Sequence, residues 1–140
     1  MYSIVVKKDI FYIFAKFIYC DGNKEIPPLK QTLDEVVEEF NSGIILKMID
    51  GNNRIIGSVR AKELDGTVYI GKLMVHLDYR RRAFASRLMT EIENHFPNER
   101  YELFTSTRST DNIRLYEKLG YRIFTEKVVN DELIFVFMEK

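Results

Sequence analysis

The feature that most constrains the fold of this chain is an apolar segment that passes through three adjacent arginines into a helical pattern. Residues 68–75 predict a strand, and apolar residues then recur at helical spacing over residues 83–96. Residues 101–105 predict the next strand. A strand, a helix and a second strand in this order form a parallel pair joined by a right-handed crossover. In such units, ligands bind outside the carboxyl ends of the strands.

The junction between the first of these strands and the helix is suited to hold phosphate. The first N–H groups of a helix have no intrahelical partner, and the helix dipole adds positive charge there. Arg80, Arg81 and Arg82 add donors that grip phosphate oxygens in pairs, while small Ala83 and Ala85 let a ligand approach the backbone. A solvated basic turn is the alternative, because adjacent arginines also occur at ordinary helix starts.

The length and charge of the chain narrow the class of protein. With 140 residues, of which 46% are hydrophobic, we expect a single domain over residues 1–140 that buries roughly two-thirds of its unfolded surface. The 21 Lys and Arg balance the 21 Asp and Glu, so no overall field draws the chain to nucleic acid or to an acidic membrane surface. We therefore expect no nucleic-acid partner.

Two further features concern the membrane and the cellular compartment. Residues 10–20 are apolar, but they are too few to span a bilayer and include Lys16, so they predict a buried helix. The only cysteine, Cys20, forms no internal disulfide and no metal cluster, which is typical of a cytoplasmic protein. We expect no membrane partner and no metal.

The first half of the chain predicts a strand, a short helix and a meander. Residues 3–7 alternate and predict an opening strand. Thr32 with Glu35 forms a capping box at the start of a short helix, and Gly43 follows where a helix ends. Apolar runs separated by turn residues predict an antiparallel meander over residues 44–49, 54–60 and 68–75.

The last part of the chain predicts a helix over residues 111–119, followed by a hairpin of residues 121–128 and 133–138. The expected fold class is therefore α/β (α+β). Its sheet is mixed and mostly antiparallel, with about seven strands, a central parallel pair and about four flanking helices.

Two motifs in this order resemble the GNAT superfamily of acyl-CoA-dependent N-acyltransferases, and the resemblance spans nearly the whole chain. The first is the loop of residues 80–85, Arg-Arg-Arg-Ala-Phe-Ala. It is similar to the family pattern of Arg or Gln, two variable residues, Gly, one variable residue, and Gly or Ala. Arg80 and Ala85 match this pattern, whereas Ala83 replaces the first glycine. The replacement is costly only if the position needs a positive φ.

The second motif is Asn-Ile-Arg-Leu-Tyr-Glu-Lys-Leu-Gly-Tyr over residues 112–121. The resemblance implies that acetyl-CoA is the co-substrate, that Asn112 helps to hold its arm, and that the Tyr116 hydroxyl faces the thioester sulfur. Packing of Tyr116 as an ordinary core aromatic is the alternative. The cofactor-binding residues implied by the family are Leu73, Met74, Val75, Arg80, Arg81, Arg82, Ala83, Phe84, Ala85, Ser86 and Asn112.

The implied chemistry needs hydrogen-bond donors that stabilise an oxyanion, and a group that donates a proton. Attack of an amine on a thioester builds negative charge on the carbonyl oxygen and then expels a thiolate. The resemblance assigns the first role to backbone N–H groups near Met74 and Val75. Tyr116, with a reference pKa near 10, would protonate a thiolate with a pKa of about 8.5, which is uphill by roughly 2 kcal/mol.

The amine must also lose a proton. Many relatives place a glutamate on the strand before the loop of residues 80–85, which we call the phosphate loop. In this chain, residues 67–75 contain no carboxylate and include Lys72. We expect proton loss through water or through a carboxylate on a neighbouring element, with Glu63 as the first candidate and Glu102 as a weaker one.

The sequence does not identify the acceptor. A small-molecule or peptide amine is expected, and a homodimer is one option. The competing function is a non-catalytic acyl-CoA-binding sensor or regulatory module, because Ala83 and the missing strand carboxylate both depart from the family pattern.

Overall fold

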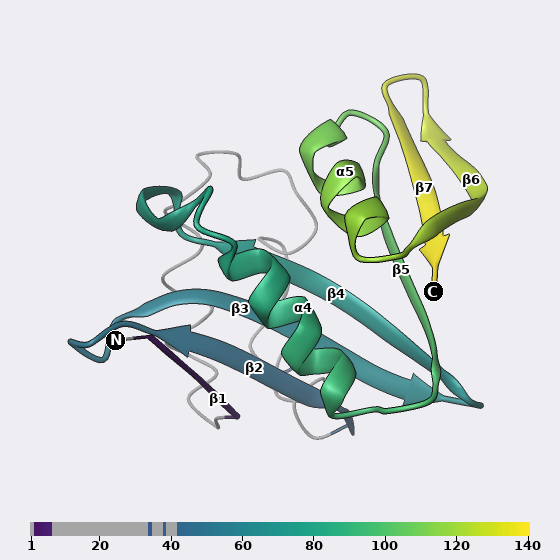
Figure 1. The fold of residues 1–140 in the computed structure, drawn as a ribbon. Coiled ribbons are helices and arrows are strands. Elements are labelled where there is room, and N and C mark those ends of the chain that lie inside the picture. Colours follow the sequence, from purple (N-terminus) through teal and green to yellow (C-terminus); the bar gives the residue numbers. More distant parts are fainter. Residues whose placement is uncertain (1, 7–33, 35–37, 39–41) are drawn as a thin grey trace.

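The computed structural model describes residues 2–6, 34, 38 and 42–140. Within these residues the chain forms one seven-stranded sheet in the order β1-β2-β3-β4-β5-β7-β6 (Figure 1). The strands are β1 (Ser3–Val6), β2 (Ile44–Ile49), β3 (Ile55–Leu64), β4 (Thr67–Val75), β5 (Arg100–Ser106), β6 (Arg122–Asn130) and β7 (Leu133–Glu139). The predicted mixed sheet is thereby confirmed.

Strands β4 and β5 are the parallel pair, and all other neighbouring strands run antiparallel. Their pairing covers only the start of each strand and ends where Tyr69 faces Glu102. Beyond that point the two strands diverge, so their carboxyl ends lie apart (Figure 1). This divergence creates the place where the loop after β4 faces the helix after β5.

A β-bulge in β4 accompanies the divergence. Ser58 pairs with Met74 but Arg60 pairs with Gly71, so Lys72 and Leu73 together face the single residue Val59. Lys72 adopts a left-handed φ of 53°. A bulge bends its strand and increases the local twist, and bulges often lie beside functional sites.

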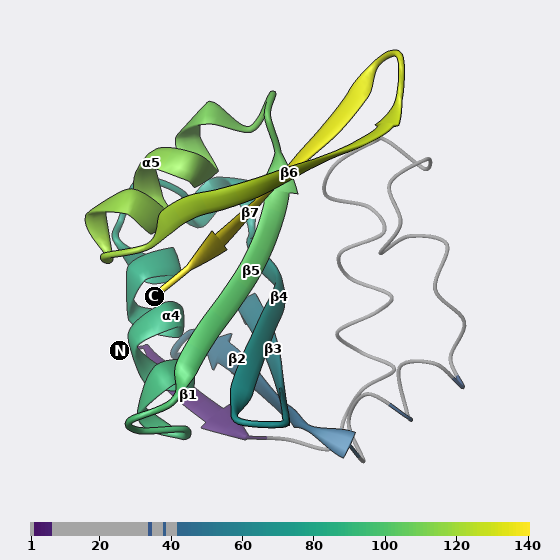
Figure 2. The same ribbon diagram turned by 90° about the vertical axis from the view of Figure 1, so that its right-hand side faces the viewer.

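Helix α4 (Phe84–Asn94) supplies the core on one face of the sheet. Its side chains Leu88, Met89 and Ile92 are fully buried, and they belong to the same cluster as Leu46 and Met48 of β2. Each such side chain contributes roughly 1.5–3 kcal/mol through the apolar surface that it removes from water. Helix α5 (Thr110–Lys118) lies on the same side of the sheet as α4 (Figure 2).

The expected number of helices needs correction. The described residues contain two α-helices, rather than about four, and a short 3₁₀ turn η1 (Leu77–Tyr79) that the sequence did not indicate. The helix expected over residues 10–20 falls outside the described residues. Of the helix expected after Thr32, Asp34, Glu38 and Ser42 are described and are helical, whereas the residues between them are not described. No helix in the described part of the chain is long and apolar enough to cross a membrane.

Candidate active site

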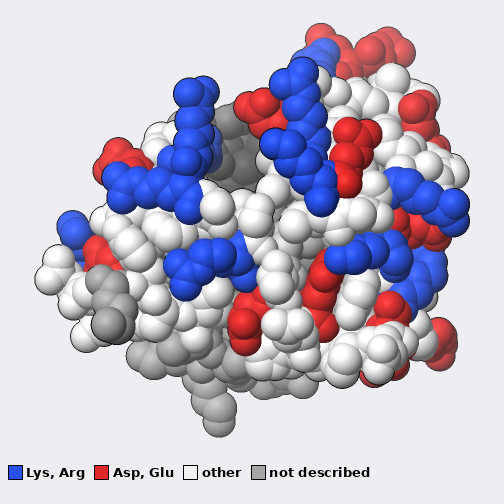
Figure 3. Space-filling view, in the orientation of Figure 1, with Lys and Arg blue, Asp and Glu red and all other residues white. Residues whose placement is uncertain are grey.

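A cavity of about 630 Å³ lies between the loop after β4 and helix α5. Figure 3 shows it as a hollow bordered by Lys and Arg side chains, over the start of α4 on one side and over α5 on the other. The walls are formed by Val75, Tyr79, Arg80, Arg81, Ala83, Phe84, Ala85, Ser86, Asp111, Asn112, Arg114, Leu115 and Lys118. Four of these side chains are cationic and one is a carboxylate, so the cavity favours an anionic ligand.

The loop wall exposes the start of α4. Ala83 is the N-cap of this helix, and no side chain caps the helix there. The first turn also contains no acidic residue. Because residues 83–86 line the cavity, the first backbone N–H groups of α4 lie at its wall. An uncapped helix N-terminus of this kind is a ready anion site.

Two residues of this loop have left-handed backbones. Arg81 has a φ of 62° and Ala83 a φ of 61°. The left-handed region costs an L-residue with a Cβ roughly 1–2 kcal/mol relative to the right-handed region. The position that holds glycine in the family pattern therefore does need a positive φ here. Ala83 adopts that conformation with a strain that glycine would not carry.

The three arginines do not play equal parts. Arg80 and Arg81 line the cavity, and the Arg80 Nε donates to the carbonyl of Val75 at 3.2 Å. Arg82 is not among the lining residues. Its guanidinium instead lies 5.6 Å from the centre of the Tyr79 ring and donates to the Tyr2 hydroxyl at 3.4 Å. Arg82 therefore supports the loop from outside the cavity.

Of the three expected residues at the end of β4, Leu73 and Val75 pack against one core cluster and Met74 packs against another. Val75 lines the cavity. Leu73 packs against the core cluster that includes α4, whereas Met74 packs against the separate cluster of Ile45 and Ile55. Beyond Tyr69 the ladder between β4 and β5 has ended, so this edge of β4 carries backbone groups that are not paired to β5. Those groups are the ones expected to stabilise an oxyanion.

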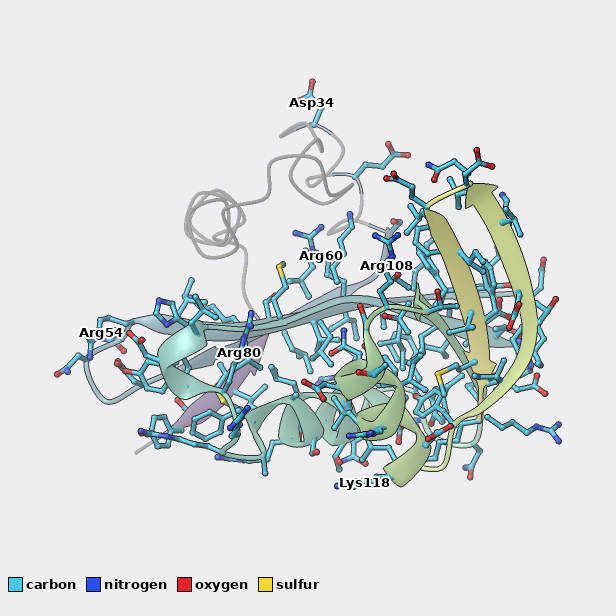
Figure 4. The ribbon with its side chains drawn as sticks, turned by 90° about the horizontal axis from the view of Figure 1, so that it is seen from above. Asp34, Arg54, Arg60, Arg80, Arg108 and Lys118 are labelled. Carbon is cyan, nitrogen blue, oxygen red and sulfur yellow. The ribbon has the colours of Figure 1, made fainter. Side chains whose placement is uncertain are left out.

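Helix α5 forms the opposite wall. Asp111, Asn112, Leu115 and Lys118 recur at helical spacing and line the cavity together with Arg114. Sequence reasoning identified only Asn112 among them. The spacing of three or four residues from Asp111 to Lys118 is the signal that would have identified the rest. From above, Lys118 lies on the α4 side of the sheet, whereas Arg60 and Arg108 lie on the opposite side (Figure 4).

Tyr116 lies one turn after Asn112 on α5, but it belongs to the core and not to the cavity lining. It is only 6% exposed, and burial raises the pKa of its hydroxyl to about 12. Its ring contacts the Tyr121 ring edge to face, with 6.0 Å between the centroids. Tyr116 is therefore packed as a core aromatic, and its role as a proton donor stays a prediction.

The two candidate bases lie away from the cavity. Glu63 pairs with Val68, seven residues before Val75 on β4, which corresponds to roughly 23 Å along the strand. Glu102 accepts a hydrogen bond from Arg100 at 2.7 Å near the start of β5. Neither carboxylate lines the cavity. Among the described residues, no group of three or more His, Cys, Asp or Glu side chains is arranged to hold a metal ion.

Comparison with known proteins agrees with this geometry. Residues 9–121 match the model of a protein family described as the acetyltransferase (GNAT) family. No curated protein sequence matches the chain. Among solved structures, the chain is similar to an acetyltransferase of the GNAT family from Streptococcus pneumoniae. The TM-score is 0.79 at 17% identity, over 100% of this chain and 99% of that chain.

Two further structures share the fold. One is a spermidine N-acetyltransferase chimera from Vibrio cholerae and hSSAT, with a TM-score of 0.76 at 15% identity, over 99% of this chain and 93% of that chain. The other, from Escherichia coli, is an N-acetyltransferase for an alanine of a ribosomal protein. It has a TM-score of 0.78 at 14% identity, over 99% of this chain and 92% of that chain. At these identities the likeness shows the fold alone.

Proposed function

Because the chain belongs to the GNAT family of acetyltransferases, we propose that it transfers an acetyl group from acetyl-CoA to a primary amine of a small molecule or peptide. The observation that carries this proposal is the uncapped, left-handed entry into α4 at the wall of a cavity bordered by cations. Coenzyme A has a pyrophosphate group, and helix N-termini of this kind bind phosphate.

The cavity residues fit coenzyme A by their donors and charge. The N–H groups of residues 83–86 would hold the pyrophosphate, and Arg80 and Arg81 would add positive charge beside it. Asn112 would hold the amide-containing arm. Arg114 and Lys118 would face the remaining phosphate charge from α5. When bound, acetyl-CoA supplies a thioester as the acyl donor.

Tyr116 is the proposed proton donor. Its hydroxyl is protonated at neutral pH, as in any tyrosine, and burial raises its pKa further, which makes it a weaker acid. Full transfer from a pKa of about 12 to a thiolate near 8.5 is uphill by about 5 kcal/mol. We therefore assign Tyr116 a hydrogen bond to the departing sulfur, with the proton moving only as the thiolate leaves. This role requires the hydroxyl to reach the cavity past the Asn112 wall.

Proton loss from the amine is assigned to water. Of the described residues that line the cavity, Asp111 is the only carboxylate, and it lies in the first turn of α5 among the phosphate-binding residues. An amine with a pKa near 8 loses its proton at a cost of about 1 kcal/mol at neutral pH, whereas a lysine-type amine costs about 4–5 kcal/mol. Without a dedicated base, acceptor amines with a pKa near 8 are favoured over lysine-type amines.

A non-catalytic acyl-CoA sensor is the second candidate. The left-handed Ala83 and the absence of a carboxylate from β4 both favour it. The two functions differ in turnover and not in binding. A sensor binds acetyl-CoA tightly and releases no thiol with any amine.

Thiol release from acetyl-CoA, measured across α-amines, polyamines and amino sugars, tests the proposal. The enzyme is expected to release thiol with at least one class, and Tyr116→Phe is expected to slow that release. Tight binding of acetyl-CoA with no release across the panel would favour the sensor.

A further inference from the structure

The carboxylate of Asp50 joins the turn between β2 and β3 to the phosphate loop. Asp50 is only 7% exposed, and both of its oxygens accept hydrogen bonds. Oδ1 accepts from the backbone N–H groups of Asn52 at 2.8 Å and Arg54 at 3.0 Å. Oδ2 accepts from the Arg54 Nε at 2.8 Å and from the Tyr79 hydroxyl at 3.2 Å. Of these donors, only Tyr79 comes from a distant part of the chain.

Tyr79 stands at the start of the phosphate loop and contacts it on several sides. Its ring lies 6.3 Å from the Phe84 ring, and the Arg82 guanidinium lies 5.6 Å from its centre. Tyr2 packs against Tyr79 edge to face at 6.3 Å and against Phe84 at 4.7 Å. A shift of Tyr79 would therefore move the residues on both sides of Ala83.

The loop needs such support because its backbone is strained. Arg81 and Ala83 both have left-handed backbones, with φ values of 62° and 61°. Residues in sparsely populated conformations persist only when the surrounding structure holds them there. The turn at Asp50 is itself well fixed, because the Asp50 N–H also donates to the Arg54 carbonyl at 3.0 Å. A rigid turn can thus hold a strained loop in place through one side chain.

We propose that Asp50 is a positioning residue for coenzyme A: through the Tyr79 hydroxyl it holds the phosphate loop in the conformation that binds the pyrophosphate. This inference rests on the proposed function, because it assigns Asp50, which lies outside the cavity, a task in binding that same ligand. Arg54 pairs with the Asp50 carboxylate, so the negative charge of Asp50 is offset within its own turn and opposes the phosphate little.

The test measures the dissociation constant of coenzyme A by calorimetry, with the full-length chain and several variants. Tyr79→Phe keeps the ring and removes only the hydroxyl. Asp50→Asn keeps an oxygen for the backbone N–H groups but loses an acceptor for Tyr79. Tyr101→Phe is the matched control, because its buried hydroxyl donates to the carbonyls of Glu93 and Phe96, at the other end of α4.

Tyr79→Phe and Asp50→Asn are each expected to weaken coenzyme A binding about tenfold, which corresponds to about 1.4 kcal/mol. In Asp50→Asn, a change outside the cavity, the rate at saturating acetyl-CoA should change less than about twofold, because the reacting groups are untouched. Tyr101→Phe should lower the melting temperature about as much as Tyr79→Phe does, but it should leave the affinity for coenzyme A unchanged. Adding Ala83→Gly to Tyr79→Phe should recover part of the affinity, because glycine adopts the left-handed loop without strain.

An affinity that stays within about twofold of wild type in Tyr79→Phe would overturn the inference, even if the variant melts earlier. Equal losses in Tyr79→Phe and Tyr101→Phe would also overturn it, since they would show a general effect of stability. A failure of the proposed function can be told apart from a failure of this inference. If the wild-type protein does not bind coenzyme A, both the function and this inference are wrong. If it binds and only the Tyr79 effect is missing, the function stands.

Discussion

The backbone N–H of Tyr121 donates to the carbonyl of Tyr116 at 2.9 Å, and the two rings meet edge to face. These two contacts hold the end of α5 against the segment that leads into β6. The Tyr121 hydroxyl in turn donates to Glu93 of α4 at 2.7 Å, and Lys140 pairs with the same carboxylate at 2.9 Å. The position of Tyr116 is therefore set by α4 and by the end of the chain, as well as by its own helix.

Tyr116→Phe should reduce the rate of acetyl transfer by about 100-fold, which is the lower end of the effect of a general acid. The ring stays in the core, so the affinity for acetyl-CoA should change little. Thiol release at saturating acetyl-CoA and calorimetry measure the two effects separately. Full activity in this variant would remove Tyr116 from the mechanism.

Ala83→Gly should stabilise the protein by about 0.5–1 kcal/mol and tighten coenzyme A binding, because it relieves the left-handed strain. Denaturant unfolding and calorimetry check the two effects. Ala85→Gly is the matched control, since the same change inside α4 should destabilise by up to about 1 kcal/mol. Destabilisation of similar size in both variants would contradict the strain at Ala83.

The contribution of Asp50 to stability should depend on pH. Burial acts to raise the pKa of this carboxyl, but hydrogen bonds from Arg54 and Asn52 outweigh it and lower the pKa to about 2 from an ordinary value of 3.8. A carboxyl with a lowered pKa stabilises the folded state above its unfolded pKa and loses that contribution as the pH falls through its folded pKa. The stability difference between wild type and Asp50→Asn should be constant above about pH 4 and shrink towards pH 2. Urea unfolding across this pH range measures the stability difference. A difference that does not change with pH would contradict the hydrogen bonding of the ionised Asp50 carboxylate.

Lys118→Gln should weaken acetyl-CoA binding about threefold at low salt, because one cation is removed from the cavity wall. The effect should fade as salt is added, since exposed charges are screened. Lys127→Gln, on exposed strand β6, is the control and should not change the affinity. Equal effects of the two variants, or an effect of Lys118→Gln that does not depend on salt, would argue against a phosphate contact at Lys118.

The strand, loop and helix around the arginines could be predicted because the apolar period changes there from two residues to 3.6. The remote position of Glu63 was also predictable in principle. The two-residue turn at Asp65 and Gly66 sets the register, which pairs Glu63 with Val68 far from Val75.

Other features depend on contacts between distant segments. Alanine itself gives no signal of the positive φ at Ala83, because it favours ordinary helical backbone, and only the glycine at this position of the family pattern indicates it. The separation of Arg82 from Arg80 and Arg81 follows from the packing of Tyr79 and Tyr2. The link from Asp50 to Tyr79 spans 29 residues and carries no periodic pattern. These relationships required the folded structure.

Amide hydrogen exchange in the presence and absence of coenzyme A tests the central claim most directly, because it locates the bound ligand along the chain. We predict slower exchange at residues 80–87, where the loop enters α4, with a second protected segment at residues 111–118. The strand ends near Glu63 and the hairpin of β6 and β7 should exchange as before. Protection that is absent from residues 80–87, or that lies elsewhere in the chain, would contradict a coenzyme A site at the start of α4.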